Sequence, residues 1–277
     1  MAEEPKVIAG LFGVGLLGSA IADRLTAAGQ PWIGYDPTRP DLAQSPNDVL
    51  ATANILILCL PTSNDTAELL QRIKRHRTII DTTTGDPAQM ARFAASHPNY
   101  LDVTIGGSSA HLRAGEAILM AGAEPEVFQA NRDFLAKLSA QVFHCGPPGA
   151  GAKMKLVFNL VLGLNRAALA EGLAFAEACG LDAKATLEIL QSGPAASKIM
   201  ERKGPKMVNR EYTPEARLAQ HHKDVRLMLS ESVKRKINLP LTQAHERVLA
   251  LAEALGHAES DNSALIEAYR SDSVNGR

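Results

Sequence analysis

One glycine-rich run constrains the fold of this chain more than any other feature of its sequence. The run Gly13-Val14-Gly15-Leu16-Leu17-Gly18 follows the apolar segment Lys6–Leu11 and opens the helix-like segment Leu16–Ala28. In a strand–turn–helix context, the first glycine permits a tight turn, the second lets the backbone approach a pyrophosphate, and the third allows close packing of helix on strand. The helix N-terminus then stabilises the phosphate charge. We therefore expect a dinucleotide site formed by Gly13, Val14, Gly15, Leu16 and Leu17.

Short apolar segments alternate with helix-like segments through the first half of the chain. The predicted strands are Lys6–Leu11, Trp32–Tyr35, Ile55–Leu60, Thr78–Asp81, Tyr100–Ile105, Ala117–Ala121 and Gln141–His144. The predicted helices between them are Leu16–Ala28, Ala67–Arg75, Pro87–Ser96 and Pro125–Leu138. This alternation implies parallel βαβ units. It predicts an α/β fold, a Rossmann doubly wound parallel sheet followed by an all-α domain.

The second half has fewer turn residues and predicts long helices. Residues 1–151 hold 14 of the 21 glycines and 11 of the 15 prolines. An Ala- and Leu-rich segment follows Pro147-Pro148-Gly149 and ends at Cys179, which predicts a connector helix about 45 Å long. Further helices are predicted at Ala183–Gln191, Pro194–Arg202, Pro214–Lys236, Leu241–Leu255 and Ser263–Tyr269. We predict an NAD(P)-binding Rossmann domain over residues 1–148 and an all-α substrate and oligomerisation domain over residues 149–277.

Charge and cysteine content exclude several classes of protein. Lys and Arg number 29 and Asp and Glu number 30, so a polybasic surface for nucleic acid is disfavoured. The three cysteines form no CxxC pair, and the histidines show no ligand spacing, so no metal site is predicted. The first residues lack the basic region of a signal peptide, and the apolar run Leu156–Leu164 is too short to span a bilayer. We expect a cytoplasmic protein with no membrane or nucleic-acid partner.

Three strand ends supply further candidate cofactor ligands. Asp36 ends the second predicted strand, 18 residues after Gly18, where an acid accepts hydrogen bonds from the ribose of NAD and repels a 2′-phosphate. This favours NAD, although Arg39 could contact the phosphate of NADP. Leu60-Pro61 and Thr84 follow the third and fourth strands, at the edge where open α/β sheets bind ligands. Asp36 before Pro37 and the hydroxyl of Thr84 could also be ordinary turn residues.

Two segments could provide the chemistry. Gly106, Gly107, Ser108 and Ser109 close the fifth strand and offer backbone N–H groups and hydroxyls to an anion such as a carboxylate, unless they form a plain turn. Lys155 and Asn159 lie four residues apart on the connector helix and share one face beside an apolar stripe. Desolvation at such a place tunes the pKa of a lysine. Lys153 lies about 200° around the helix and is expected to be solvated.

Read together, these motifs resemble the β-hydroxyacid dehydrogenase family, the 3-hydroxyisobutyrate dehydrogenase-like group of the 6-phosphogluconate dehydrogenase superfamily. Four blocks match in order. They are the dinucleotide run at Gly13–Gly18; Asp102-Val103-Thr104-Ile105-Gly106-Gly107-Ser108 with Gly115; Gly149, Gly151, Lys155 and Asn159; and Lys223-Asp224-Val225 with Gly256, Asp261 and Ser263. The blocks extend over nearly the whole chain, and the third block is the most specific.

The resemblance implies a role for each block. Lys155 is the general acid or base, Asn159 orients the substrate, and the Gly106–Ser109 loop holds a carboxylate. Leu60, Pro61 and Thr84 line the nicotinamide, and Lys223 closes over the cofactor, which is NAD or NADP. The resemblance also implies a small carboxylate or other anionic substrate and a homodimer or homotetramer assembled through the all-α domain.

The chain departs from the family pattern in the substrate block. Gly106 replaces the family serine that contacts the carboxylate, and Thr104 replaces the usual proline. This resembles the sulfolactaldehyde reductase branch, so the substrate need not be 3-hydroxyisobutyrate. Two alternatives share the architecture: an imine reductase, which usually has Asp or Tyr in place of Lys155, and a non-catalytic dinucleotide-sensing module, which loses that lysine.

Overall fold

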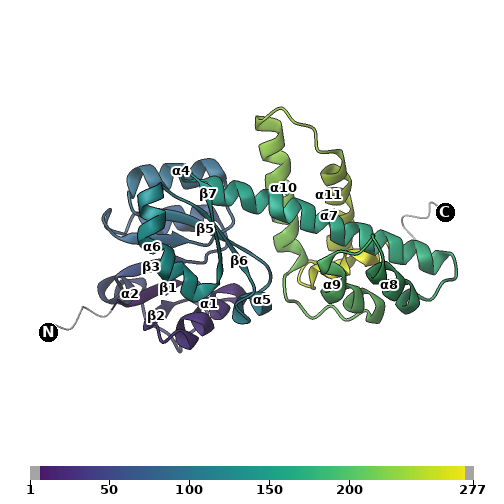
Figure 1. Ribbon diagram of the computed structural model, residues 1–277, viewed down its shortest axis with the longest axis horizontal. Coiled ribbons are helices and arrows are strands. Elements are labelled where there is room, and N and C mark those ends of the chain that lie inside the picture. The colour runs from purple at the N-terminus through teal and green to yellow at the C-terminus, as the bar shows by residue number, and fades with distance from the viewer. Residues whose placement is uncertain (1–6, 272–277) are drawn as a thin grey trace. The chain divides into compact units, whose positions relative to one another are not determined.

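The computed structural model describes residues 7–271, and their contacts divide the chain into two compact units, Met1–Lys155 and Leu156–Arg277 (Figure 1). The first unit contains the sheet and the second is helical. The predicted start of the first strand at Lys6 lies outside the described residues.

The sheet unit contains seven strands in the order β2-β1-β3-β4-β5-β6-β7. They are β1 Ala9–Phe12, β2 Trp32–Tyr35, β3 Ile55–Leu58, β4 Thr78–Asp81, β5 Tyr100–Gly106, β6 Ile118–Gly122 and β7 Gln141–Gly146. Strands β1 to β5 are parallel, which confirms the predicted Rossmann architecture. Strand β6 is antiparallel to β5, and β7 is parallel to β6, so the last two strands run opposite to the others. The eleven residues between β5 and β6 are fewer than a parallel crossover requires.

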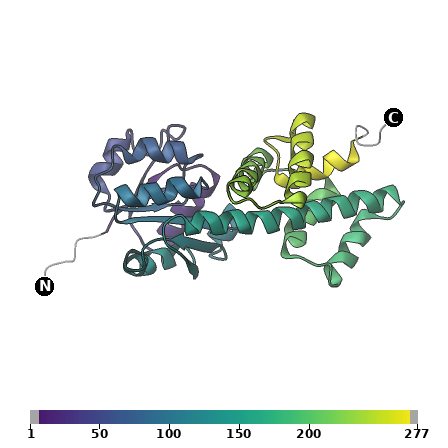
Figure 2. The same cartoon turned by 90° about the horizontal axis from the view of Figure 1, so that it is seen from above.

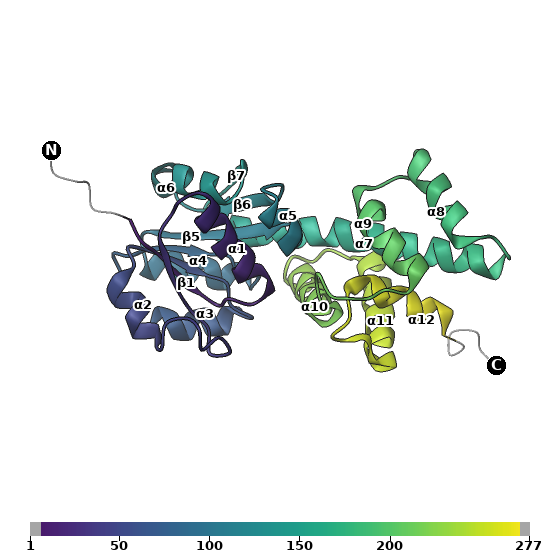
Figure 3. The same cartoon turned by 90° about the horizontal axis from the view of Figure 1, so that it is seen from below.

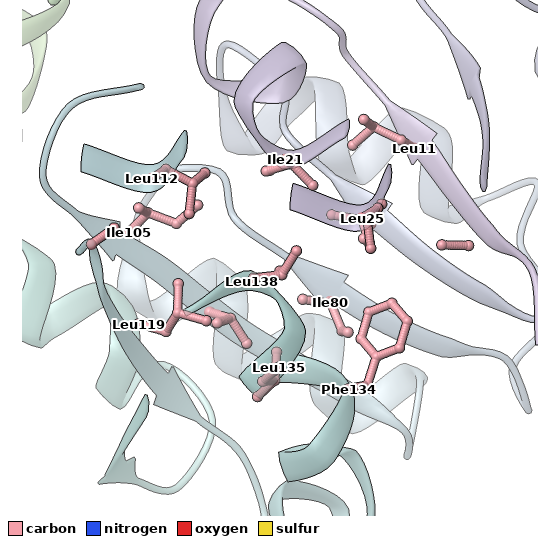
Figure 4. Packing of buried hydrophobic residues seen from close by; sticks show 14 of the residues in the cluster. Leu11, Ile21, Leu25, Ile80, Ile105, Leu112, Leu119, Phe134, Leu135 and Leu138 are labelled. Carbon is pink, nitrogen blue, oxygen red and sulfur yellow. The ribbon is translucent and has the colours of Figure 1, made fainter. Parts of the chain in front are cut away.

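Helices cover both faces of the sheet (Figure 3). Helices α1 Leu16–Ala27, α5 Ser109–Arg113 and α6 Pro125–Leu138 pack on one face, where residues such as Ile21, Leu119 and Leu135 form a buried cluster (Figure 4). Helices α2 Pro46–Thr52, α3 Ser63–Leu70 and α4 Pro87–Ser96 pack on the other face. Because successive strand residues point to opposite faces, Ile57 and Leu58 of β3 belong to different clusters. Strand β3 is therefore covered on both faces, and all its residues except the first, Ile55, are buried.

The helical unit is built around one long helix. Helix α7 runs without interruption over Ala150–Ala178 (Figure 2). It is followed by α8 Ala183–Ser192, α9 Lys198–Asn209, α10 Leu218–Lys234, α11 Pro240–Ala252, a π-helical turn at Glu253–His257, a 3₁₀ turn at Asn262–Ile266 and α12 Glu267–Arg270. Leu169 and Leu173 of α7 pack with buried side chains of these later helices, including Leu218 and Leu249.

Several helix bounds differ from the sequence predictions for identifiable reasons. Helix α3 begins at Ser63 rather than Ala67, because Thr62 and Asp65 form a capping box. A second capping box, between Ser45 and Asp48, starts α2, which the sequence analysis did not predict. Helix α9 begins after Ser197 and continues through Pro205 to Asn209, beyond its predicted end.

Among the described residues, α7 is the one helix that is long and apolar enough to span a membrane by length and composition. Its most apolar window has a mean hydropathy of 1.3, and 44% of that window is buried inside the structure. Lys155, Asn159 and Arg166 are buried polar residues of this helix. The core helix of a globular domain meets the same criterion, so α7 is weak evidence for a membrane span.

Candidate active site

The glycine-rich turn lies between the end of β1 and the start of α1, as predicted. Gly13 has a φ of 86°, in the region that favours glycine. A Cβ at Gly13 would lie 2.2 Å from the carbonyl oxygen of Cys59, and one at Gly18 would lie 2.0 Å from the carbonyl oxygen of Gly13. These two glycines are therefore required by the protein itself, since any side chain would collide with backbone.

Gly15 differs from these two glycines, because no atom beyond its neighbours in the chain lies within 4 Å of the position where its Cβ would be. Gly15 is also the N-cap residue of α1, and no side chain caps this helix. The first turn of α1 contains no acidic residue. The first N–H groups of the helix can therefore bind an anion, and the open face of Gly15 leaves room for one. This cradle fits the pyrophosphate of a dinucleotide, with Val14, Leu16 and Leu17 beside it.

Asp36 lies at the end of β2 next to this turn. Its Oδ2 accepts a hydrogen bond from the N–H of Val14 at 2.7 Å, and its Oδ1 accepts the N–H and the hydroxyl of Thr38. Partial burial acts to raise the pKa of Asp36, but the hydrogen bonds from Thr38 and Val14 outweigh it and lower the pKa. Asp36 is thus an ionised carboxylate that both supports the glycine turn and can repel a 2′-phosphate.

Arg39, the residue that could contact a 2′-phosphate, is paired within its own loop. Its Nε and Nη2 donate to the two carboxylate oxygens of Asp41 at 2.9 and 2.7 Å. Both side chains are exposed, so the pair is weak in free energy. The geometry nonetheless directs the guanidinium toward Asp41.

The loops after β3 and β4 are tied together at the same edge of the sheet. The N–H of Leu60 donates to Oγ1 of Thr83 at 3.1 Å, and the N–H of Thr83 donates to Oδ1 of Asp81 at 2.9 Å. Asp81 also accepts the hydroxyl of Tyr100 at 2.7 Å, and burial raises the pKa of Asp81. Beside these bonds, Pro61 is exposed and Thr84 is partly exposed. The structure thus places both predicted loops at the carboxyl ends of parallel strands.

The Gly106–Ser109 loop joins β5 to α5. Gly107 has a φ of 127°, and Ser109 is buried. Ser108 caps α5: its N–H donates to Nδ1 of His111 at 3.1 Å, and its hydroxyl lies 3.0 Å from the same nitrogen. The sequence analysis did not single out His111. Because the N–H and the hydroxyl of Ser108 both contact His111, Ser108 has less capacity to bind an anion than the sequence analysis predicts.

Lys155 reaches the end of β5 from the second turn of α7. Its Nζ donates a hydrogen bond to the carbonyl oxygen of Ile105 at 2.5 Å, and its side chain is buried. Lys153 is exposed, as the helical-face argument predicts. The ammonium of Lys155 is therefore held at the carboxyl end of β5, directly before Gly106.

Asp102 is a buried residue of this region that the sequence analysis did not count as a site residue. Its side chain is fully buried in β5, and it accepts hydrogen bonds from the backbone N–H groups of Gly149 and Ala152, each at 2.7 Å. Burial raises the pKa of Asp102 to about 7. The available signal was a single charged residue inside a strand that has no other charge.

The remaining predicted residues lie in the helical unit. Asn159, one helical turn beyond Lys155 on α7, donates from Nδ2 to Oδ2 of Asp224 on α10 at 3.0 Å. Lys223 is partly exposed, and its Nζ lies 3.7 Å from Oδ1 of Asp224. Asp224, which belongs to the fourth family block, is buried. The structure thus groups Asn159, Lys223 and Asp224 within this unit.

The adjacent histidines of α10 have separate partners. Nε2 of His221 lies 3.0 Å from Nε2 of His245, while His222 contacts Glu246 and Glu253. Burial lowers the pKa of His245 to about 3, and the charge of Arg166 acts in the same direction. Across residues 7–271, no three His, Cys, Asp or Glu side chains are grouped so as to hold a metal ion.

Comparison with known families assigns both units. Residues 8–146 match the family described as the NAD binding domain of 6-phosphogluconate dehydrogenase. Residues 149–269 match the family described as NAD-binding of NADP-dependent 3-hydroxyisobutyrate dehydrogenase. The two matches meet between β7 and α7.

Similar proteins cover most of the chain. A 2-hydroxy-3-oxopropionate reductase of Escherichia coli strain K12 is 27% identical, over 94% of this chain and 96% of its own. A 2-(hydroxymethyl)glutarate dehydrogenase of Eubacterium barkeri is also 27% identical, over 96% of each chain. The structure of a Mycobacterium tuberculosis 3-hydroxyisobutyrate dehydrogenase with L-serine superimposes with a TM-score of 0.83 at 22% identity, over 96% of this chain and 100% of that one. This last likeness establishes the shared fold.

Proposed function

This chain belongs to the β-hydroxyacid dehydrogenase family of NAD(P)-dependent dehydrogenases and reductases, and we propose that it interconverts a small β-hydroxy acid and the corresponding semialdehyde or oxo acid. In this proposal, Lys155 is the general acid and base. The supporting observation is the hydrogen bond from Nζ of Lys155 to the carbonyl oxygen of Ile105, because it holds a buried ammonium at the sheet edge where the glycine turn also lies.

The chemistry divides between the cofactor and the protein. When bound at the Gly13–Gly18 turn, the nicotinamide cofactor supplies or accepts the hydride. During reduction of a carbonyl, Nζ of Lys155 donates a proton to the oxygen on which negative charge develops, which stabilises the transition state. During oxidation of the alcohol, the neutral amine of Lys155 accepts that proton.

The proposed substrate is a small carboxylate or related anion. Gly106 and Gly107 have no side chains that would block an anion, and the loop lies immediately after Ile105, the acceptor for Lys155. Backbone N–H groups of such a segment can bind a carboxylate. The two curated relatives are named for hydroxy- and oxo-acid substrates, which supports this class. Because Gly106 stands where the family has a serine that contacts the carboxylate, the proposed substrates also include other anions, such as sulfonates.

For the cofactor, the ionised Asp36 and the Arg39–Asp41 pair favour NAD over NADP. In the helical unit, Asn159 would orient the substrate and Lys223 would close over the cofactor. Assembly through the helical unit as a homodimer or homotetramer, and a cytoplasmic location, stay predictions.

The test compares two lysines two residues apart on α7. Purified Lys155→Ala and Lys153→Ala variants would be assayed by nicotinamide absorbance with NADH and NADPH. The substrate panel would contain small semialdehydes and oxo acids, including 2-hydroxy-3-oxopropionate and a sulfonated aldehyde. We expect Lys155→Ala to lose about 10³-fold in kcat, within the usual range for a general acid. The exposed Lys153 should be replaceable with little change. Wild-type-like turnover by Lys155→Ala would refute the role of Lys155. A loss of NADH affinity in this variant as large as its loss of turnover would also refute it.

A further inference from the structure

The joint between β5 and α7 depends on one buried carboxylate. Oδ1 of Asp102 accepts the N–H of Gly149 at 2.7 Å, and Oδ2 accepts the N–H of Ala152 at 2.7 Å. The first N–H groups of a helix have no partner within the helix. The residues before α7, Pro147-Pro148-Gly149, have no side chain that could cap it. Asp102 therefore supplies, from a strand 47 residues earlier, the cap that the local sequence lacks.

Close backbone contacts reinforce this joint. A Cβ at Gly151 would lie 2.3 Å from the carbonyl oxygen of Asp102, so only glycine allows α7 to approach β5 this closely. A Cβ at Gly122 would lie 2.5 Å from Oδ1 of Asp102. Two residues along β5, the hydroxyl of Thr104 donates to the carbonyl oxygen of Gly151 at 2.9 Å. The first turn of α7 is thus held to β5 by side chains and by direct contact of the two backbones.

The same strand accepts the hydrogen bond of Lys155. Asp102 contacts Ala152, and Ile105, three residues later on β5, contacts Lys155, three residues later on α7. The two contacts therefore align the strand with the helix over one helical turn. A shift or rotation of this turn would move Nζ of Lys155 away from the carbonyl oxygen of Ile105.

We propose that Asp102 is a positioning residue for Lys155, acting by capping the first turn of α7 with both oxygens of its carboxylate. The inference rests on the proposed role of Lys155 as proton donor and acceptor. It assigns to Asp102 no contact with substrate or cofactor.

The groups around Asp102 act on its pKa in opposite directions. Its pKa is about 7, because burial and, to a smaller extent, the charge of Asp81 raise it by more than the two N–H donors lower it. Asp81 on β4 pairs with Asp102 in the register of the sheet. Tyr100 and Cys145 are further titratable groups that interact electrostatically with Asp102. Two N–H donors aimed at two oxygens favour the ionised form, which is the form that caps α7 fully.

The test uses Asp102→Asn, in which an amide NH₂ must replace one of the two acceptors and face a backbone N–H. Asp81→Asn is the matched control, because it removes an equally buried carboxylate one strand away that accepts hydrogen bonds from Tyr100 and Thr83 rather than from α7. Hydrogen exchange of residues 149–155 reports on the cap. The labelling rate of Lys155 by an amine-reactive reagent, relative to exposed Lys153 in the same molecule, reports on its placement.

In Asp102→Asn we expect exchange at Gly149 and Ala152 to accelerate by about tenfold or more. The labelling ratio of Lys155 to Lys153 should rise severalfold, and kcat should fall while the Kd for NADH stays within about twofold. At about pH 8.5, where Asp102 is ionised with or without the charge of Asp81, Asp81→Asn should leave the exchange of residues 149–155 and the labelling ratio at wild-type values. Unchanged exchange, or an unchanged labelling ratio, in Asp102→Asn would overturn the proposal.

A second variant guards against failure to fold. In Asp102→Ser, a hydroxyl can accept one of the two hydrogen bonds and places no donor against the other, so intermediate exchange and labelling are expected. Wild-type values for this variant would also overturn the proposal. Exchange and labelling are measured without cofactor or substrate, so they judge Asp102 separately from the proposed reaction. Turnover by Lys155→Ala would refute the reaction role and leave the exchange result intact.

Discussion

Asn159 on α7 donates a hydrogen bond from Nδ2 to Oδ2 of Asp224 on α10 at 3.0 Å, and both side chains are buried. The bond determines which way the amide of Asn159 is oriented, since an amide NH₂ rather than a carbonyl must face a carboxylate. Asp224 therefore orients the residue proposed to orient the substrate.

Removal of Asp224 should lower activity through Asn159. In Asp224→Ala, the buried amide loses its acceptor, at a cost of about 1–3 kcal/mol. We expect kcat/KM for the substrate to fall about tenfold. The control is Arg226→Ala, two residues further on α10 and exposed. Steady-state kinetics of both variants would decide, and equal activities would argue against an orienting role for Asp224.

The glycines of the cofactor turn should respond differently to one added methyl group. At Gly15 the methyl meets no protein atom, so Gly15→Ala should keep the wild-type Tm and raise the Kd for NADH at least about tenfold. At Gly18 the methyl would lie 2.0 Å from the carbonyl oxygen of Gly13, so Gly18→Ala should be destabilised by about 1–3 kcal/mol or more. Thermal unfolding and cofactor titration separate these outcomes. A large fall in Tm for Gly15→Ala would contradict the assignment of its open face to a ligand.

The charge of Asp36 should determine cofactor preference. Because its lowered pKa keeps it ionised at neutral pH, Asp36→Asn removes one negative charge that would face a 2′-phosphate. We expect the ratio of the Kd for NADPH to the Kd for NADH to fall about tenfold, or ~1.4 kcal/mol. Asp23→Asn changes the net charge equally at an exposed position of α1 and should leave the ratio unchanged. A preference for NADPH in the wild-type protein would show that Asp36 does not exclude the phosphate.

The raised pKa of Asp102 predicts how stability changes with pH. Folding raises this pKa from an ordinary value near 3.8 to about 7, so between these values the folded chain holds a proton that the unfolded chain has released. The contribution of Asp102 to the free energy of unfolding should therefore be largest below about pH 4, decline as the pH rises toward 7, and stay constant above that. Asp102→Asn lacks this dependence.

Urea unfolding of wild type and Asp102→Asn from pH 4 to 8 would measure this difference, because the contributions of other groups largely cancel between the two proteins. Asp81, Tyr100 and Cys145 interact electrostatically with Asp102, so Asp81→Asn should shift the midpoint of the decline to lower pH. A difference that does not change with pH would contradict the raised pKa.

Much of the fold and part of the site were predictable from the sequence because their signals are local. The strand Thr78–Asp81 and the helix Pro125–Leu138 have the predicted bounds, since apolar patterning and turn residues mark both ends. The glycine turn was predictable because each glycine serves a contact within one strand–turn–helix unit. The burial of Lys155 and the exposure of Lys153 followed from helical geometry. The sequence analysis missed α2 and placed the start of α3 four residues too late, although the capping boxes that begin both helices are also local signals.

By itself, the sequence determined the alternation of strands and helices, the glycine turn and the burial of Lys155 rather than Lys153, because each depends on residues close together in the chain. Only the tertiary structure decided that Asp102 caps a helix 47 residues away, that Asp224 is buried against Asn159, and that β6 and β7 reverse the direction of the sheet. The physical reason is that burial and hydrogen bonding between distant segments depend on how whole elements pack. The residue type alone does not show whether an aspartate is buried or exposed.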